Sequence, residues 1–521
     1  MRDLSRRTLI AAGGLVLAPS WVIAAGPSPI ANTTHGPVRG YADQGIQVFK
    51  GVRYGADTGP RRFRPPAAPR PWTKVLDATA YGPSSPQGGG DGQAQSEDCL
   101  FLNVWTPGLR DGGRRPVMVY LHGGAYSNGS GSSPLYDGVR LCRRGDVVVV
   151  TINHRLNVFG YGFLARLAGP DFADSGNAGM LDILLALAWV RDNAAAFGGD
   201  PSRVMVFGQS GGGAKIATMM AMPAAEGLFH SAATMSGQQV TASGPLHATE
   251  RMTLLLAAVG LTPDRAAEAA TLPAERLLAG LAVRDPFTPG GLDFGPVLDE
   301  RSLTRHPFWP DAAPQGLKIP MIIGNTRDEA RAFVARPDPF AMGWDEVAGR
   351  IAPEMRVDID PDHVVAEYRR LYPDYSPSEV FFAAVTAGRS WRGAVIEAEE
   401  RARAGAPAFV YQLDLSSTVE GGRLRAMHAT DIPLVFDNLA ARGSPVAPSA
   451  AAQSVADRMS EAFIALARTG DPNHPAIPAW TPYDLTRRAT LLFDADTRLA
   501  DDPRGGERRL FAKVPYIQPG T

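Results

Sequence analysis

The chain has 521 residues, of which 45% are hydrophobic and 20% are charged, and its formal net charge at pH 7 is −1. This composition is typical of a globular protein with enough apolar material for a large core. No strongly basic block is present, so the sequence gives no support to nucleic-acid binding and little to adhesion on anionic membranes.

The N-terminus has the features of an export signal. Arg6 and Arg7 precede a mildly apolar stretch that ends in two alanines. Twin arginines before such a stretch resemble the Tat signal, which exports folded proteins in bacteria. We therefore predict a signal peptide over residues 1–25 and a periplasmic or secreted protein, with a short amphipathic or membrane-anchoring N-terminus as the alternative. No later segment is apolar over the length of a spanning helix, so we expect no stable membrane insertion.

Strand-like and helix-like segments alternate through the middle of the chain. Short apolar runs of buried-strand type lie at 116–122, 146–153, 203–207, 318–324 and 407–414. Apolar residues with helical spacing occupy 181–197, and a further helix is predicted over 212–222. This alternation predicts a mostly parallel sheet covered by helices on both faces. Two helix-rich segments, 246–312 and 344–390, are predicted to be insertions over the carboxyl edge of that sheet, where α/β proteins bind ligands.

Cysteine and histidine usage argues against two kinds of site. Cys99 and Cys142 are the only cysteines, so no disulfide framework can form. The nine histidines are scattered, and none stands in an HxxxH or HExxH pattern. The sequence therefore offers no metal-ligand cluster.

A single serine stands between glycines directly after an apolar run. The stretch GQSGG (Gly208–Gly212) fits the pattern G-x-S-x-G, with a strand before it and a helix after it. Glycines two residues before and after Ser210 relieve the crowding of a very sharp turn. The serine hydroxyl would then be held above the sheet at a helix N-terminus, whose dipole favours developing negative charge. This context indicates a nucleophile.

A second glycine pair follows the strand at 116–122. In the stretch HGGA (His122–Ala125), consecutive backbone N–H groups would be exposed, as in the oxyanion holes of lipases and esterases. A plain glycine turn is the alternative.

These motifs together resemble the type-B carboxylesterases of the α/β-hydrolase superfamily, which include bacterial para-nitrobenzyl esterases. Two stretches match the family signatures, EDCLFLNVW (Glu97–Trp105) and FGGDPSRVMVFGQSGG (Phe197–Gly212). The likeness continues through five further segments: GPVRG (Gly36–Gly40), RRFRPP (Arg61–Pro66), NHRLNVFGYGFL (Asn153–Leu164), GNAGMLD (Gly176–Asp182) and LARTGDPN (Leu466–Asn473). The resemblance implies one α/β-hydrolase domain over residues 26–521.

The resemblance also implies a Ser–Glu–His triad. The family's acid follows a strand in a motif like GxNxDEG, and here GNTRDEA places Glu329 in that register, with Asp328 beside it. The family's histidine precedes an xxE[LI]P stretch, and MHATDIP places His428 there, with Asp431 in the usual glutamate position. If His428 is not the base, His122 is the next candidate.

The implied mechanism needs neither a cofactor nor a metal. His428 would take the Ser210 proton while Glu329 holds the imidazole. The backbone N–H groups of Gly124, Ala125 and Gly211 would bind the oxyanion. Ser236 matches a serine that lies near the triad carboxylate in this family, with a simple buried hydroxyl as the alternative.

Departures from the family pattern bear on the substrate and on the thiols. Gln209 stands where a glutamate usually precedes the nucleophile, and the loop before the EDCL motif lacks the tryptophan that stacks on choline in cholinesterases. Both departures argue against a cationic substrate. Ser85 replaces the cysteine that pairs with the EDCL cysteine in secreted eukaryotic relatives. We therefore expect Cys99 to be an unpaired core thiol, with a Cys99–Cys142 bridge as the alternative.

The sequence thus predicts an exported serine hydrolase that acts on a small-molecule carboxylic ester, and it favours a monomer. An amidase or acyltransferase that uses the same triad stays open, because the triad does not specify the leaving group or the acceptor. A non-catalytic binding protein on the same scaffold is disfavoured, because all three triad residues are present.

Overall fold

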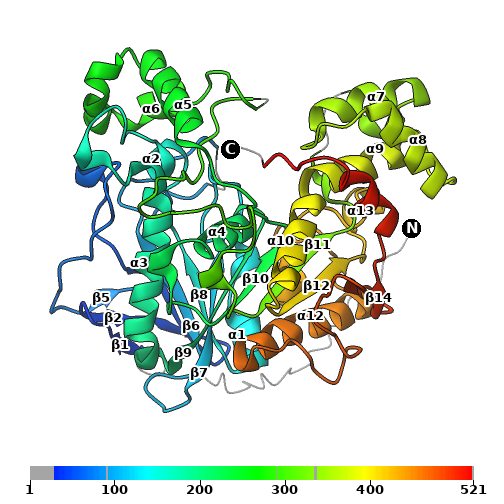
Figure 1. The fold of residues 1–521 in the computed structure, drawn as a ribbon. Coiled ribbons are helices and arrows are strands. Elements are labelled where there is room, and N and C mark those ends of the chain that lie inside the picture. The colour runs from blue at the N-terminus through cyan, green and yellow to red at the C-terminus, as the bar shows by residue number, and fades with distance from the viewer. Residues whose placement is uncertain (1–27, 90–91, 289, 334–336, 519–521) are drawn as a thin grey trace, which may run out of the picture.

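The computed structural model describes residues 28–89, 92–288, 290–333 and 337–518 (Figure 1). The predicted signal peptide lies outside these ranges. Most strands belong to one sheet of 11 strands, in the order β14-β13-β12-β11-β10-β9-β7-β8-β6-β4-β3. A second sheet has three short strands, in the order β1-β2-β5.

The centre of the large sheet is parallel and its two edges are antiparallel. Seven neighbouring strands run parallel: β8 (Val148–Ile152), β7 (Arg115–Leu121), β9 (Gly199–Gln209), β10 (Ser231–Met235), β11 (Met321–Thr326), β12 (Ala408–Leu413) and β13 (Ala489–Phe493). Antiparallel pairing adds β14 (Arg498–Asp501) at one edge, and β6 (Phe101–Thr106), β4 (Ile46–Arg53) and β3 (Tyr41–Asp43) at the other. The strands of the small sheet are β1 (Ile30–Asn32), β2 (Pro37–Arg39) and β5 (Leu76–Asp77).

Helices cover both faces of the large sheet, because the side chains on both of its faces are apolar and buried. In β7, Val117 and Val119 belong to one buried apolar cluster, whereas Met118 and Tyr120 belong to another. Successive side chains of a strand point to opposite faces, so each cluster marks one face. The first cluster includes residues of α3 (Ala178–Asn193), α4 (Gly211–Met219) and α10 (Arg392–Arg403). The second includes residues of α1 (Val139–Gly145), α11 (Ile432–Val435) and α12 (Ala450–Thr469).

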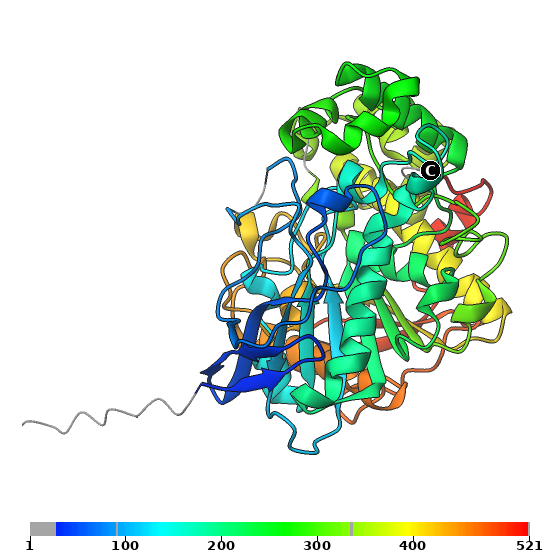
Figure 2. The same ribbon diagram turned by 90° about the vertical axis from the view of Figure 1, so that its left-hand side faces the viewer.

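The helix-rich insertions lie near the carboxyl ends of the parallel strands, as the sequence predicts. At the top of Figure 1, α5 (Pro245–Ala258) and α6 (Ala274–Gly280) lie on one side. On the other side lie α7 (Trp344–Ile351), α8 (Pro361–Leu371) and α9 (Pro377–Thr386), which share a separate apolar cluster. Figure 2 shows the small β-sheet (dark blue) at the opposite end of the molecule from α5 and α6. The remaining helices are α2 (Asn157–Tyr161) and α13 (Gly505–Phe511).

Both cysteines are buried free thiols. The Cys142 thiol donates a hydrogen bond to the Val147 carbonyl at 3.0 Å. The expectation for Cys99 is therefore confirmed, and the alternative of a Cys99–Cys142 bridge is wrong.

Candidate active site

Ser210 occupies a strained turn between β9 and α4. Its backbone has φ 56° and ψ −127°, which is outside the regions that residues with a Cβ normally adopt. A Cβ added to Gly212 would lie 1.9 Å from the Leu121 carbonyl oxygen, and one added to Gly208 would lie 2.8 Å from the same atom. The flanking glycines therefore let the turn pack against the end of β7, and this contact holds the strained backbone in place.

Glu329 follows β11 and His428 follows β12, and the structure brings the two side chains together. Glu329 lies directly after β11, and its Oε2 makes a short hydrogen bond with the Nδ1 atom of His428. The other oxygen accepts the backbone N–H of Thr326 at 2.8 Å and the amide of Asn325 at 3.4 Å. Burial raises the pKa of Glu329, but His428, with the hydrogen bonds, lowers it to a net value below the usual range. The carboxylate is therefore charged and can hold the imidazole.

The Nε2 atom of His428 faces the residue before the serine. The side-chain nitrogen of Gln209 lies 3.1 Å from Nε2 and donates to it. Nε2 is therefore the acceptor nitrogen, and Nδ1 carries the proton that is shared with Glu329. This tautomer is the one that a general base needs. Ser210 and His428 line the same pocket, which encloses about 140 Å³.

The loop after β7 presents backbone N–H groups beside the serine. Gly124 and Ala125 have positive φ values of 88° and 50°. A Cβ added to Gly211 would lie 2.1 Å from the Ala125 carbonyl oxygen, so the loop packs tightly against the start of α4. Among the described residues, no acceptor is found for the N–H groups of Gly124, Ala125 or Gly211. These three groups are therefore free to donate to a bound ligand.

Comparisons with known proteins agree with this arrangement. The sequence model described as "Carboxylesterase family" matches residues 27–509. Para-nitrobenzyl esterase of Bacillus subtilis is 35% identical, over 92% of this chain and 98% of that protein. Phenmedipham hydrolase of Pseudarthrobacter oxydans is 34% identical, over 89% of this chain and 94% of that protein. The solved structure of Geobacillus stearothermophilus carboxylesterase EST55 at pH 6.2 superposes with a TM-score of 0.83 at 36% identity, over 92% of this chain and 99% of that one.

The chain belongs to the carboxylesterase family. It is an enzyme with the α/β-hydrolase fold that hydrolyses carboxylic esters.

The carboxylate next to Glu329 has a different environment. Asp328 accepts a hydrogen bond from Arg331 at 3.1 Å. It lines a separate pocket with Arg327 and Arg425, and neither Ser210 nor His428 is part of that lining. Asp328 therefore provides a matched control for the function of Glu329.

Two further predicted residues of this carboxylesterase lie close to the histidine–glutamate pair. Ser236 is buried beside Glu329, and its hydroxyl contributes to lowering the pKa of that carboxyl. Asp431 is fully buried and accepts a hydrogen bond from the Tyr411 hydroxyl at 2.7 Å. Burial raises the pKa of Asp431 to about 6. The two carboxyls, Glu329 and Asp431, thus have opposite pKa shifts.

His122, the alternative base, lies behind the glycine loop. Its Nδ1 donates to the Gly123 carbonyl at 2.8 Å, and its ring stacks on that of His154. Burial lowers the pKa of His122 to about 3, and the charge of Lys215 adds to that effect. His122 is not among the residues that line the Ser210 pocket.

Three residues that the sequence analysis did not identify lie around this site. Phe333 packs against His428, with 5.1 Å between the ring centres. Arg389 lines the pocket of Ser210. Lys215 donates hydrogen bonds to the glycine loop. All three are ordinary residue types outside any motif, so no sequence signal distinguishes them.

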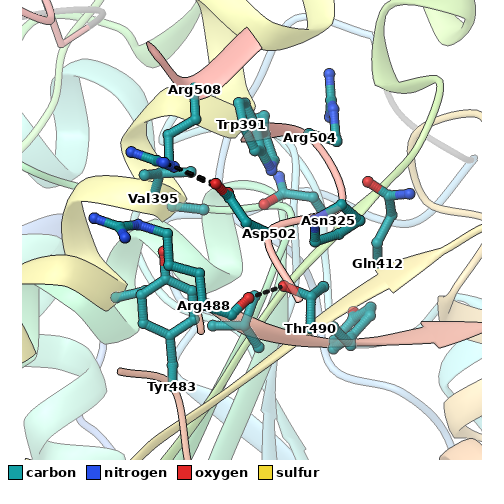
Figure 3. Close-up of a pocket in the computed structure, with 15 residues that line it drawn as sticks. Asn325, Trp391, Val395, Gln412, Tyr483, Arg488, Thr490, Asp502, Arg504 and Arg508 are labelled. Carbon is teal, nitrogen blue, oxygen red and sulfur yellow. Dashed lines mark hydrogen bonds and ion pairs between the residues drawn. The ribbon is translucent and has the colours of Figure 1, made fainter. Parts of the chain in front are cut away.

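A second pocket near the carboxyl ends of β11 and β12 carries several charged side chains (Figure 3). Arg508 is paired with Asp502 at 2.7 Å, and Arg504 is paired with Glu507. These charges already have partners, so the pocket does not resemble a second reactive site. In the described part of the chain, no group of three or more His, Cys, Asp or Glu side chains is placed to hold a metal ion. Within the same ranges, no helix combines the length and apolarity that are needed to cross a bilayer.

Proposed function

We propose that this carboxylesterase works through an acyl-enzyme on Ser210. His428 accepts the hydroxyl proton as the serine oxygen attacks the ester carbonyl, and Glu329 stabilises the imidazolium. The negative charge on the carbonyl oxygen is bound by the N–H groups of Gly124, Ala125 and Gly211. Each such donor typically contributes ~3–4 kcal/mol to lowering the barrier.

The cycle closes with a second attack. The tetrahedral intermediate collapses, His428 returns the proton to the leaving alcohol, and the acyl group stays on Ser210. Water then loses a proton to His428 and attacks the acyl carbonyl, which releases the carboxylic acid and restores the serine. The proposal is carried by one observation, the hydrogen bond between Glu329 and His428 in the lining of a pocket that also contains Ser210.

An organophosphate label tests the nucleophile directly. We expect one phosphoryl group per chain, on the peptide that contains Ser210, with loss of hydrolysis of a para-nitrophenyl ester. The Ser210→Ala variant should take up no label and should keep the melting temperature of the wild type to within a few degrees. Labelling of a different residue in the folded wild type would contradict the assignment.

We further propose that the protein is exported to the periplasm or the outside of the cell. The support is the twin-arginine sequence before a mildly apolar stretch. Replacement of Arg6 and Arg7 by lysine should leave the protein in the cytoplasm with an uncleaved N-terminus. Normal appearance of that variant outside the cytoplasm would show that export does not depend on the arginine pair.

A further inference from the structure

Arg389 brings a positive charge into the wall of the substrate pocket. Its guanidinium lies 4.8 Å from the ring centre of Phe333, whose ring packs on His428. The other charged residue in this part of the lining, Glu329, is already bonded to His428. Arg389 is therefore the charged residue of this lining that lies outside the Glu329–His428 pair, and a substrate bound at Ser210 would lie near it.

A second arginine stands beside the first. Arg356 and Arg389 both line a neighbouring pocket that also includes Ser127 and Asn128 of the glycine loop. The backbone N–H of Arg356 donates to the Gly388 carbonyl at 3.3 Å, so the two segments are joined. The buried Nε of Arg356 has no hydrogen-bond partner among the described residues. Burial lowers the pKa of Arg389, and the like charge of Arg356 lowers it further.

Two carboxylates oppose this charge only in part. Glu354 contacts Arg389 at 3.4 Å through a single nitrogen–oxygen pair, and its side chain is 42% exposed. Exposed ion pairs of this kind are weak. Asp293 lines the same neighbouring pocket as Arg356 and Arg389, and burial raises its pKa and so favours its neutral form. The two arginines thus keep donors and positive charge that an anionic group could use.

We propose that Arg389, supported by Arg356, binds a carboxylate that the ester substrate carries. A planar guanidinium can donate two parallel hydrogen bonds to a carboxylate, which orients the substrate as well as attracting it. The substrate class would be half-esters of dicarboxylic acids or esters of carboxylate-bearing alcohols. This inference rests on the ester hydrolysis proposed above.

Matched pairs of esters test the inference. The acyl arm compares para-nitrophenyl hydrogen succinate with para-nitrophenyl butyrate, and the alcohol arm compares meta-carboxyphenyl acetate with phenyl acetate. The measured quantity is the ratio of kcat/KM for the anionic ester to that for its neutral partner, in the wild type and in Arg389→Gln. We expect the ratio to fall at least ~10-fold in one arm, which corresponds to about 1.4 kcal/mol. The arm that responds identifies which side of the ester carries the carboxylate.

Two further variants sharpen the test. Arg389→Lys keeps the charge without the planar fork and should retain part of the ratio. Arg392→Gln is the control, because Arg392 is a half-buried arginine three residues away that does not line either pocket. An unchanged ratio in both arms of Arg389→Gln would overturn this inference while leaving the esterase proposal intact. Failure of the wild type to hydrolyse any of the four esters would instead contradict the proposed function.

A separate observation concerns Lys215, a buried lysine in α4. Its Nζ donates to the Ala125 carbonyl at 2.7 Å and to the His122 carbonyl at 3.3 Å. It also lies 5.3 Å from the ring centre of Tyr126. Among the described residues, the hydrogen-bond partners of Lys215 are these two carbonyls and no carboxylate, and burial lowers its pKa to about 7. A buried ammonium without a counter-ion is costly, so its carbonyl partners matter.

The two carbonyls bonded by Lys215 flank the peptides that supply the loop's oxyanion donors. His122 and Ala125 hold the carbonyls on either side, and the N–H groups of Gly124 and Ala125 lie between them. The intervening carbonyls are also bonded. That of Gly123 accepts from the His122 ring at 2.8 Å, and that of Gly124 accepts the N–H groups of 127 and 128 at 3.1 and 3.0 Å. With all four carbonyls bonded, no peptide in the loop can rotate without losing a hydrogen bond.

We infer that Lys215 is a positioning residue for the oxyanion hole. It fixes the loop from behind, so that the donors of Gly124 and Ala125 face the carbonyl oxygen of an ester at Ser210. The transition state should depend on this alignment more than the bound substrate does, because the full negative charge forms only in the transition state.

Lys215→Met tests this role because it keeps the side-chain length and removes the donors. Active sites are first counted by organophosphate titration. Per titrated site, we expect kcat to fall ~30- to 100-fold with KM within about twofold. Affinity for a trifluoromethyl ketone, which forms a tetrahedral adduct, should fall by a similar factor. The melting temperature should not decrease, because the variant no longer buries an uncompensated charge.

A purely structural function for Lys215 gives the opposite result. In that case the melting temperature and the number of titratable sites fall, while kcat per site stays within twofold of the wild type, and the inference is overturned. If Lys215→Met does not fold, Lys215→Gln retains one donor group and should show the same loss in kcat to a smaller extent.

Discussion

The two sides of the site around Ser210 are built from different parts of the chain. On the base side, two side chains separated by 99 residues meet, and Glu329 holds His428. On the proposed oxyanion side, the groups are the backbone N–H donors of 124 and 125, held by hydrogen bonds to the carbonyls around them. The base side therefore depends on the identity of its residues, whereas the oxyanion side depends on conformation. A substitution on the base side should therefore abolish the reaction, whereas a substitution on the oxyanion side should only misalign the donors.

The largest effect is expected on the base side. His428→Ala should lower kcat by about 10⁴-fold or more, because the triad residues act as a unit and loss of one costs nearly as much as loss of all. Steady-state hydrolysis of a para-nitrophenyl ester measures this, with circular dichroism to confirm the fold. Activity within tenfold of the wild type would show that the base is another residue.

Glu329 and Asp328 provide the next test. Glu329→Gln should lower kcat ~10³- to 10⁴-fold, because the amide no longer stabilises the imidazolium and disturbs the tautomer of His428. Asp328→Asn should lower kcat less than tenfold, since Asp328 contacts Arg331 and faces another pocket. Both variants are compared at equal fractions folded. A larger loss in Asp328→Asn would place the acid one residue earlier.

A substitution in the loop tests the oxyanion side. Gly124 has φ 88°, and an added Cβ would lie 2.3 Å from the carbonyl oxygen of Asn128. Gly124→Ala should therefore displace the loop and lower kcat ~10²- to 10³-fold, the usual cost of one lost oxyanion donor. Labelling of Ser210 by an organophosphate should persist at a reduced rate, because the base side is unchanged. Complete loss of labelling in a folded variant would mean that the two sides are not independent.

Residues that stand in sequence motifs could be predicted, whereas residues that act through contacts with distant parts of the chain could not. The sequence predicts a triad of Ser210, Glu329 and His428 because each stands in a motif with its own residue types and order. The function inferred for Lys215 could not be predicted, because it depends on carbonyl oxygens about 90 residues earlier in the chain. The contact between Gln209 and His428 joins residues 219 positions apart and has no local signal.

The fold shows a similar limit. Five of the seven parallel strands, β7, β8, β9, β11 and β12, could be predicted because each contains a short apolar run, whereas β13 (ATLLF) was not predicted. Strand β10 was missed because its sequence, SAATM, is made of small residues without the β-branched pattern of a buried strand. The short antiparallel strands β1, β2 and β3 have three residues each, too few to show a period of two.

A smaller effect is expected from Gln209, the residue before Ser210 whose side chain contacts His428. In a site of effective dielectric ~20, a charge about 5 Å away is worth roughly 3 kcal/mol. Gln209 supplies no charge, and the positive charge of Arg389 in the lining of the Ser210 pocket repels a cationic substrate. We therefore expect short neutral esters to exceed choline esters in kcat/KM by at least ~10-fold. Gln209→Glu should shift this ratio toward the cation, and equal wild-type rates on matched esters would contradict the prediction.

The smallest effect concerns Asp431 and should appear in stability. Its pKa of about 6 in the folded protein, raised by burial, lies above the ~3.9 of an unfolded aspartate. The folded state therefore holds this proton more tightly, and the stability that it contributes is present below about pH 4 and lost as the pH rises to about 6. Since one pKa unit corresponds to about 1.4 kcal/mol, the loss is about 2–3 kcal/mol.

Asp431→Asn removes this titration and keeps an oxygen that can accept the Tyr411 hydroxyl. The free energy of unfolding of the variant minus that of the wild type should therefore be about 2–3 kcal/mol larger near pH 8 than near pH 4, which means that the variant is relatively more stable at pH 8. Urea unfolding at the two pH values measures it, and the difference between variant and wild type cancels the other titrating groups. A pH-independent difference would show that Asp431 stays charged beside Glu329, so that the base side holds two buried anions against one histidine rather than one.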